Sequence, residues 1–136
     1  MKIINMTGKN IAIFSQESTE KIRKGSFVKT YVKLGEVPFT KLISQGCIIA
    51  AEEEVEEGVF PCFSGGRIID RKITYSKPEG VPDKLDDDAI YVVTRIAACA
   101  LLHSGYNMEM FRVKSGPVLS EEDDAVIGYT GLARYL

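Results

Sequence analysis

The fold is decided by one stretch of the sequence, Ala89-Ile90-Tyr91-Val92-Val93-Thr94-Arg95-Ile96-Ala97-Ala98-Cys99-Ala100-Leu101-Leu102. Its first five residues are apolar and mostly β-branched or aromatic, which is typical of a buried strand. The residues after Thr94 are apolar on nearly all sides of a helix, and Thr94 itself suits the N-cap position. We therefore predict a strand that runs directly into a buried helix.

The junction between this strand and helix is the best candidate for a binding site. A helix start exposes backbone N–H groups and a partial positive charge, which together favour an anion. Arg95 adds a full positive charge, although a cation at a helix N-terminus opposes the helix dipole and costs up to about 1 kcal/mol. Two explanations remain open: Arg95 binds an anionic ligand, or it pairs with an internal carboxylate among residues 86–88. Thr94 can also act as a cap that needs no ligand.

Composition limits the class of protein. The chain has 136 residues, of which 45% are hydrophobic and 26% charged, and this mix fits a single domain over residues 1–136. The net charge of -2 argues against a nucleic-acid polymer as partner, because backbone binding needs clustered positive charge. The first residues lack the apolar core of a secretion signal and no apolar run is long enough to span a membrane, so we expect a soluble, cytoplasmic protein.

The first half of the chain contains short β patterns. Residues 2–6 and 10–14 are apolar runs around Thr7-Gly8-Lys9, which predicts a hairpin. Residues 26–37 alternate between apolar and polar side chains and predict one long or bent strand. Residues 39–43 fit a short helix, whereas 47–51 fit a strand that leads into a solvated acidic block.

The second half adds two hairpins and a connection. Residues 59–63 and 68–75 flank Ser64-Gly65-Gly66-Arg67 and predict one hairpin. Residues 76–88, rich in proline and aspartate, predict an exposed connection. Residues 108–113 and 125–130 predict the other hairpin. Together these patterns predict an α+β fold, a mainly antiparallel sheet with one central buried helix and room for one short extra helix. Because that helix is apolar all round, we also expect a homo-oligomer, a dimer or higher.

Other residues could complete a ligand site. Arginines in or beside strands can hold a phosphate through their planar guanidinium groups, and an aromatic ring opposite an arginine can clamp a purine. Beside Thr94 and Arg95, the candidate ligand-binding residues are Arg67, Arg71, Arg112, Arg134, Phe63 and Tyr129. The alternative is that the glycine pair forms a plain hairpin turn and that the aromatic side chains belong to the core.

No complete catalytic or metal-binding motif is present in the sequence. His103 is the only histidine, and the three cysteines are too irregularly spaced for a metal site or a set of disulfides. Neither GxGxxG nor GxxxxGK[ST] occurs, which argues against a nucleotide-hydrolysing loop. We therefore expect no catalytic residues, no metal, no cofactor and no enzyme activity.

Three motifs resemble a group of small phage and prophage proteins. They are residues 5–9 (Asn-Met-Thr-Gly-Lys), residues 90–97 around the junction, and residues 126–134 (Val-Ile-Gly-Tyr-Thr-Gly-Leu-Ala-Arg). Members of that group open with Asn-Leu-Thr-x-His, carry a Tyr-x-Val-Ser/Thr strand-to-helix junction and end with Ile-Gly-x-x-Gly-Leu. Met6 and Lys9 stand where the group has leucine and histidine.

The resemblance extends to the phage anti-Thoeris sponge proteins. It implies an oligomeric protein that binds a phosphorylated, nucleotide-like immune signal, of the cyclic ADP-ribose type or a cyclic oligonucleotide, without cleaving it. Such binding would block host antiphage defence in the host cytoplasm. The alternative hypothesis is a phage-encoded adaptor or inhibitor that binds a host protein through its acidic loops.

Overall fold

The computed structural model describes residues 1–63 and 65–135, apart from the side chains of residues 61–63. Strands account for 51% of the chain and helices for 11%. The protein is therefore a mainly β protein with one α-helix, in agreement with the predicted sheet and single main helix. None of the helices in the described residues is long and apolar enough to cross a bilayer.

The described elements follow one another along the chain in a simple order. They are β1 (Lys2–Asn5), β2 (Ile11–Ile13), the 3-10 helix η1 (Gln16–Ser18), β3 (Thr19–Lys24), β4 (Phe27–Val32), β5 (Thr40–Leu42), β6 (Glu52–Phe63), β7 (Gly66–Tyr75), β8 (Ala89–Val92), α1 (Arg95–His103), the 3-10 helix η2 (Met108–Met110), β9 (Phe111–Leu119) and β10 (Val126–Ala133).

The main sheet is mixed and nearly closes into a barrel. Its strand order is β1-β8-β9-β10-β2-β5, and β4 adds to β9 while β3 pairs with β4. β1, β8 and β9 run parallel to one another, as do β10 and β2, whereas β9 and β10 are antiparallel. The expectation of a mainly antiparallel sheet was thus wrong. The helix α1 carries the chain from β8 to its neighbour β9, and a crossover of this kind produces parallel strands.

The buried amide of Asn5 joins the two ends of this strand order. Its Nδ2 donates to the carbonyl oxygens of Lys9 and Leu42 at 2.7 and 2.8 Å, so that the end of β5 is held against β1. Its Oδ1 accepts from the backbone N–H and the hydroxyl of Thr7 at 3.0 and 2.7 Å. The backbone N–H of Gln45 donates to the Asn5 carbonyl at 2.9 Å. All four hydrogen-bonding positions of the side chain are therefore used at a site with no solvent exposure.

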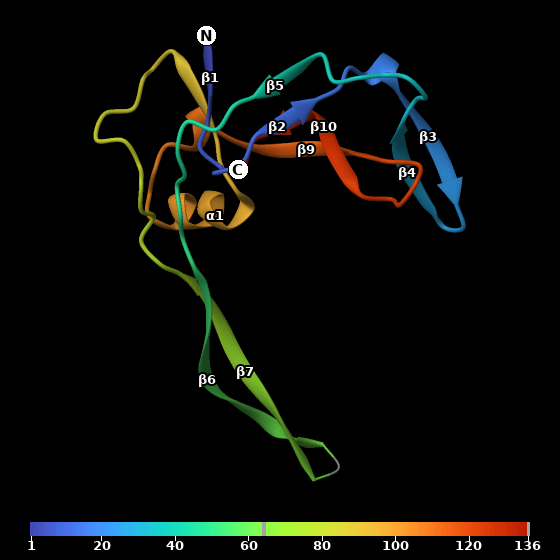
Figure 1. The fold of residues 1–136 in the computed structure, drawn as a ribbon. Helices are drawn as coiled ribbons and strands as arrows, with labels where there is room; N and C mark the ends of the chain where they lie inside the picture. The colour runs from blue at the N-terminus through green and yellow to red at the C-terminus, as the bar shows by residue number, and fades with distance from the viewer. Residues whose placement is uncertain (64, 136) are drawn as a thin grey trace.

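The core lies between α1 and the strands that flank it. Ala97, Ala98 and Leu101 are buried on the sheet side of α1. Tyr91 of β8 and Phe111 of β9 face each other with ring centroids 6.0 Å apart. The small alanines allow the helix to approach the sheet closely, as the sequence predicted, and Figure 1 shows α1 lying beneath the β1–β9 region. The helix is only partly covered, since Ile96 and Leu102 remain 41% and 39% exposed.

Several local predictions were confirmed. The strand-to-helix junction occurs as β8 and α1, and the two later hairpins occur as β6–β7 and β9–β10. The first strand of the last hairpin is displaced, because residues 108–110 form η2 and β9 continues to Leu119. Residues 76–88 form a connection without a named helix or strand. In each confirmed hairpin the partner strands are adjacent in the sequence, so the pairing follows from local turn signals.

Predictions of which strands pair with each other, and of where a strand begins and ends, were less accurate. The strands at 2–6 and 10–14 exist, but β1 pairs with β8 and β2 with β10 and β5, so they form no hairpin. Residues 26–37 contain only β4, which pairs with the unpredicted strand β3 across a turn at Gly25, where φ is +63°. Residues 40–42 form the strand β5 rather than a helix, because they pair with β2. The acidic block is exposed, as predicted, and forms the first half of β6, but residues 47–51 make only isolated bridges instead of the predicted strand.

Substitution of Asn5 tests whether its hydrogen bonds hold the end of β5 against β1. We expect Asn5→Ala to lower the free energy of unfolding by about 3 kcal/mol or more, because four hydrogen bonds disappear from a site that water does not reach. Asn107→Ala is the matched control, since Asn107 is exposed and caps only η2 through one bond to the backbone N–H of Glu109. Urea unfolding measures the free energy of unfolding of both variants. Equal losses would show that the Asn5 hydrogen bonds stabilise the fold no more than the single bond of Asn107.

Tight packing of β10 against β2 provides a second test. A Cβ added at Gly128 would lie 2.5 Å from Cε2 of Phe14 and 2.8 Å from the Ala12 carbonyl oxygen. We expect Gly128→Ala to cost roughly 1–3 kcal/mol, because the buried Phe14 ring must move. In the same strand, Gly131→Ala adds a methyl group 3.8 Å from the Ser115 hydroxyl, an ordinary contact. Thermal unfolding should separate the two variants, and a Gly131→Ala loss as large as that of Gly128→Ala would contradict this packing.

Candidate functional site

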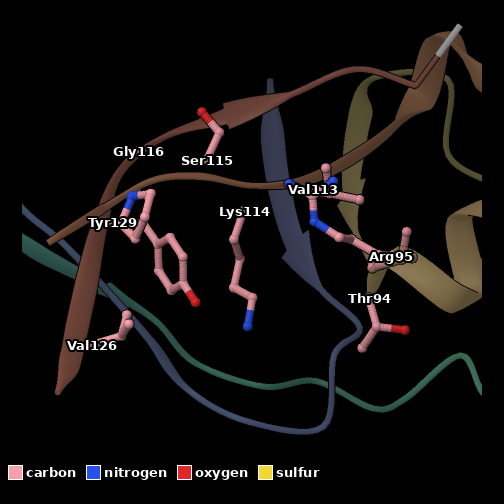
Figure 2. A pocket seen from close by; sticks show the side chains of 10 residues that line it. Thr94, Arg95, Val113, Lys114, Ser115, Gly116, Val126 and Tyr129 are labelled. Atoms are coloured by element: carbon pink, nitrogen blue, oxygen red, sulfur yellow. The ribbon is translucent and has the colours of Figure 1, made fainter. Parts of the chain in front are cut away.

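A cleft of about 530 Å³ lies where α1 begins and the β9–β10 hairpin bends. Its walls combine the β8–α1 junction with the middle of β9 and with β10. The lining residues are Val93, Thr94, Arg95, Val113, Lys114, Ser115, Gly116, Pro117, Val126 and Tyr129. Figure 2 shows Thr94 and Arg95 on one side of this cleft and Lys114 and Tyr129 on the other. Three of the predicted ligand residues, Thr94, Arg95 and Tyr129, therefore meet in one place.

Thr94 shapes the start of α1. Its backbone is extended, with φ −71° and ψ 161°, and its hydroxyl accepts a hydrogen bond from the backbone N–H of Ala97 at 3.2 Å. This is the N-cap role that the sequence predicted. Because the hydroxyl is used inside the helix, Thr94 contributes to the cleft mainly by fixing where the first turn begins.

Arg95 has no acidic partner among the residues that the structure describes. Its guanidinium Nη1 donates to the Tyr135 hydroxyl over 3.5 Å, a long hydrogen bond. Two of the three carboxylates proposed as internal partners lie against other groups, since Asp86 pairs with Lys2 at 3.0 Å and Asp88 lies 3.8 Å from the N-terminal ammonium group; Asp87 is exposed. Among the described residues, Arg95 therefore forms no internal salt bridge. It lines the cleft instead.

The pKa of Asp86 supports this account of the carboxylates. A hydrogen bond from the Asp88 backbone N–H and the nearby ammonium group of Lys2 hold the pKa of Asp86 below its usual value. The same contact raises the pKa of Lys2. Asp86 is thus a satisfied carboxylate, stabilised in its charged form without Arg95.

Lys114 and the segment after it were missed by the sequence analysis. The Lys114 ammonium group lies 5.0 Å from the centroid of the Tyr129 ring, in a cation–π contact. Gly116 has φ +67°, and a Cβ there would collide with the Thr130 hydroxyl. A glycine followed by Pro117 inside a strand signals irregular backbone, and this signal could have marked the segment.

The cleft has a positive electrostatic character. Arg95 and Lys114 are the two charged residues in its lining, and neither Asp nor Glu belongs to it. The same lining contains neither His nor Cys. The arrangement can bind an anion and stack a flat ring on Tyr129.

The other predicted ligand residues lie outside the cleft lining. Arg112 donates to the carbonyl oxygens of Glu109 and Phe111 at 2.7 and 2.9 Å, and Arg134 pairs with the Glu109 carboxylate at 2.6 Å. Arg67 and Arg71 are exposed on β7, in the separate β6–β7 sheet. The side chain of Phe63 lies outside the described part of the structure. The arginine set therefore does not form a single site.

Comparison with known proteins gives no relative for this chain: no protein-family model, no curated protein and no solved structure matches it. No group of three or more metal-ligating side chains occurs among the described residues either. The functional argument therefore rests on the geometry and charge of the cleft.

The two residues at the β8–α1 junction should contribute differently to the free energy of unfolding. We expect Thr94→Ala to lower the free energy of unfolding by about 1 kcal/mol, because a backbone N–H loses its cap. Arg95→Ala should leave stability unchanged or raise it by up to about 1 kcal/mol, because a cation is removed from the positive end of α1. Chemical denaturation of the two variants tests this contrast. A larger loss for Arg95→Ala than for Thr94→Ala would mean that Arg95 is a structural residue.

Proposed function

We propose that the cleft binds a phosphorylated, nucleotide-like small molecule. The observation that supports this most directly is that Arg95 and Lys114 line one cleft without an acidic neighbour in the lining, beside the half-buried ring of Tyr129. A site that brings two cations together costs free energy when it is empty, and an anion offsets that cost. The volume of about 530 Å³ falls in the range of small-molecule sites.

Each lining residue has a distinct part in this proposal. Arg95 supplies a planar guanidinium group for a phosphate at the N-terminal end of α1, where the helix dipole also favours negative charge. Lys114 adds a second, more flexible cation on β9. The Tyr129 ring offers a face on which a base can stack, which is a contact that tolerates different bases. The ligand would thus span the cleft from α1 to β10.

The proposed role is sequestration without turnover. The cleft lining holds no Asp, Glu, His or Cys, and its Lys114 ammonium group lies against the Tyr129 ring, which favours binding over catalysis. The motifs at residues 5–9, 90–97 and 126–134 resemble those of phage and prophage proteins. We therefore propose a sponge that withdraws a nucleotide immune signal, of the cyclic ADP-ribose type or a cyclic oligonucleotide, and thereby weakens host antiphage defence.

Isothermal titration against cyclic ADP-ribose isomers and cyclic oligonucleotides tests the proposal. We expect one class of ligand to bind and to be recovered intact after the protein is heated. Arg95→Ala and Lys114→Ala should each weaken that binding about 10- to 100-fold, which corresponds to the loss of one charge-assisted hydrogen bond of about 1.5–3 kcal/mol. Added salt should weaken binding further, because the contacts are charged.

Arg134→Ala is the matched control for these titrations. It also removes one arginine charge, but Arg134 lies outside the cleft lining and makes an exposed ion pair with Glu109. Its affinity should therefore stay within about twofold of the unmodified protein, since exposed ion pairs contribute little. No binding across the whole panel, recovery of a cleaved ligand, or an Arg134→Ala loss equal to that of Arg95→Ala would each overturn the proposal.

A further inference from the structure

The hairpin of β6 and β7 projects from the barrel as a long two-stranded arm (Figure 1). Its strands contain 12 and 10 residues and pair only with each other. At a rise of about 3.3 Å per residue, the arm extends roughly 30 Å. Its contact with the barrel is at the base, where the Tyr75 ring stacks on His103 of α1 with centroids 5.0 Å apart.

Such an arm lacks the support that a two-stranded ribbon needs. An isolated hairpin is marginally stable in water, and stability normally requires further strands or a covering layer. Both faces of this arm nevertheless carry exposed apolar side chains. Phe60 pairs with Ile68 on one face, and Val59 pairs with Ile69 on the other. Their exposures range from 39% to 54%. Both outer edges also present unpaired backbone groups, which can template another strand.

Charge is divided unequally between the two strands of the arm. β6 contains five glutamates and no basic residue. β7 contains Arg67, Arg71 and Lys72 with a single acidic residue, Asp70. Two β6 edges would therefore repel each other, and so would two β7 edges. A β6 edge beside a β7 edge would instead place opposite charges next to each other.

We propose that the arm binds a second copy of this chain, with the β6 edge of one arm alongside the β7 edge of the next. The partner is another copy because each arm carries both the acidic edge and the basic edge that complements it. Edge pairing supplies the missing strands, and neighbouring arms bury the apolar pairs near the tip. Since the two contacting surfaces differ, the contact is head to tail and closes into a ring when the rotation between copies permits. This inference is independent of what the cleft binds.

Charge reversal tests the contact. In light scattering after size exclusion, the unmodified protein should have the mass of two or more 15.0 kDa chains. Glu53→Lys, Glu54→Lys, Glu56→Lys and Glu57→Lys together should make the β6 edge basic, because only Glu52 keeps its negative charge, and should reduce the mass to that of one chain. Arg71→Glu combined with Lys72→Glu should make the β7 edge acidic and do the same. The control pair Glu17→Lys and Asp87→Lys, at exposed sites away from the arm, should keep the original mass.

Mixing the two reversed proteins gives the decisive measurement. Each should have the folded circular dichroism spectrum of the unmodified protein but fail to assemble alone, because all its edges carry like charge. An equimolar mixture should regain the original mass, since the basic β6 edge of one chain complements the acidic β7 edge of the other. Both variants lose the Glu56–Arg71 cross-strand pair inside the arm. Mixing cannot restore that pair, so regained mass reports only the contact between chains.

Three results would overturn the proposal. The first is an unmodified protein that is monomeric, and the second is an oligomer whose mass neither reversal changes. The third is a pair of reversed proteins that dissociate but do not assemble when they are mixed. None of these results depends on a ligand, so the proposal can fail while binding in the cleft is retained, and the reverse also holds.

Discussion

The hydrogen bonds of the buried Asn5 amide hold together the two ends of the strand order, and the rest of the fold depends on this closure. The amide contacts the end of β5 at Leu42 and the turn at Thr7 and Lys9. β1, which ends at Asn5, is hydrogen-bonded to β8, and β8 leads into α1. Asn5 is therefore connected to the cleft through β8, which pairs with β1 and leads into the junction that lines the cleft.

The sequence predicted the parts of the fold that local signals determine. The β8–α1 junction, the N-cap of Thr94 and the two later hairpins each depend on residues close together in the chain. Partners distant in the sequence were not predictable, because the same alternating pattern fits a hairpin or a parallel pair. The strand β5 shows this most clearly: a three-residue segment takes its conformation from pairing with β2, whichever local propensity it has.

The residues of the candidate site likewise include some that local sequence identifies and others that only the tertiary structure reveals. Arg95 could be singled out because a cation opposes the dipole at a helix start, and that argument needs no tertiary information. Lys114 could not, because a lysine in a strand gives no sign of the cleft that it faces. Tyr129 was predicted as a ligand residue and lines the cleft, but its contact with Lys114 depends on the register of β10 against β9. Arg67 and Arg71 were grouped with the site only because nothing in the sequence shows that the β6–β7 arm leaves the barrel.

The two walls of the cleft come from the start and the end of a single crossover, since Thr94 and Arg95 begin α1 and Lys114 lies on β9 beyond it. A ligand that contacts both walls therefore links the two ends of this crossover reversibly. Its binding free energy is added to the free energy of unfolding, by about 2.7 kcal/mol at a concentration 100 times the dissociation constant. A saturated protein would open its core less often, and proteases would cut it more slowly than the empty form.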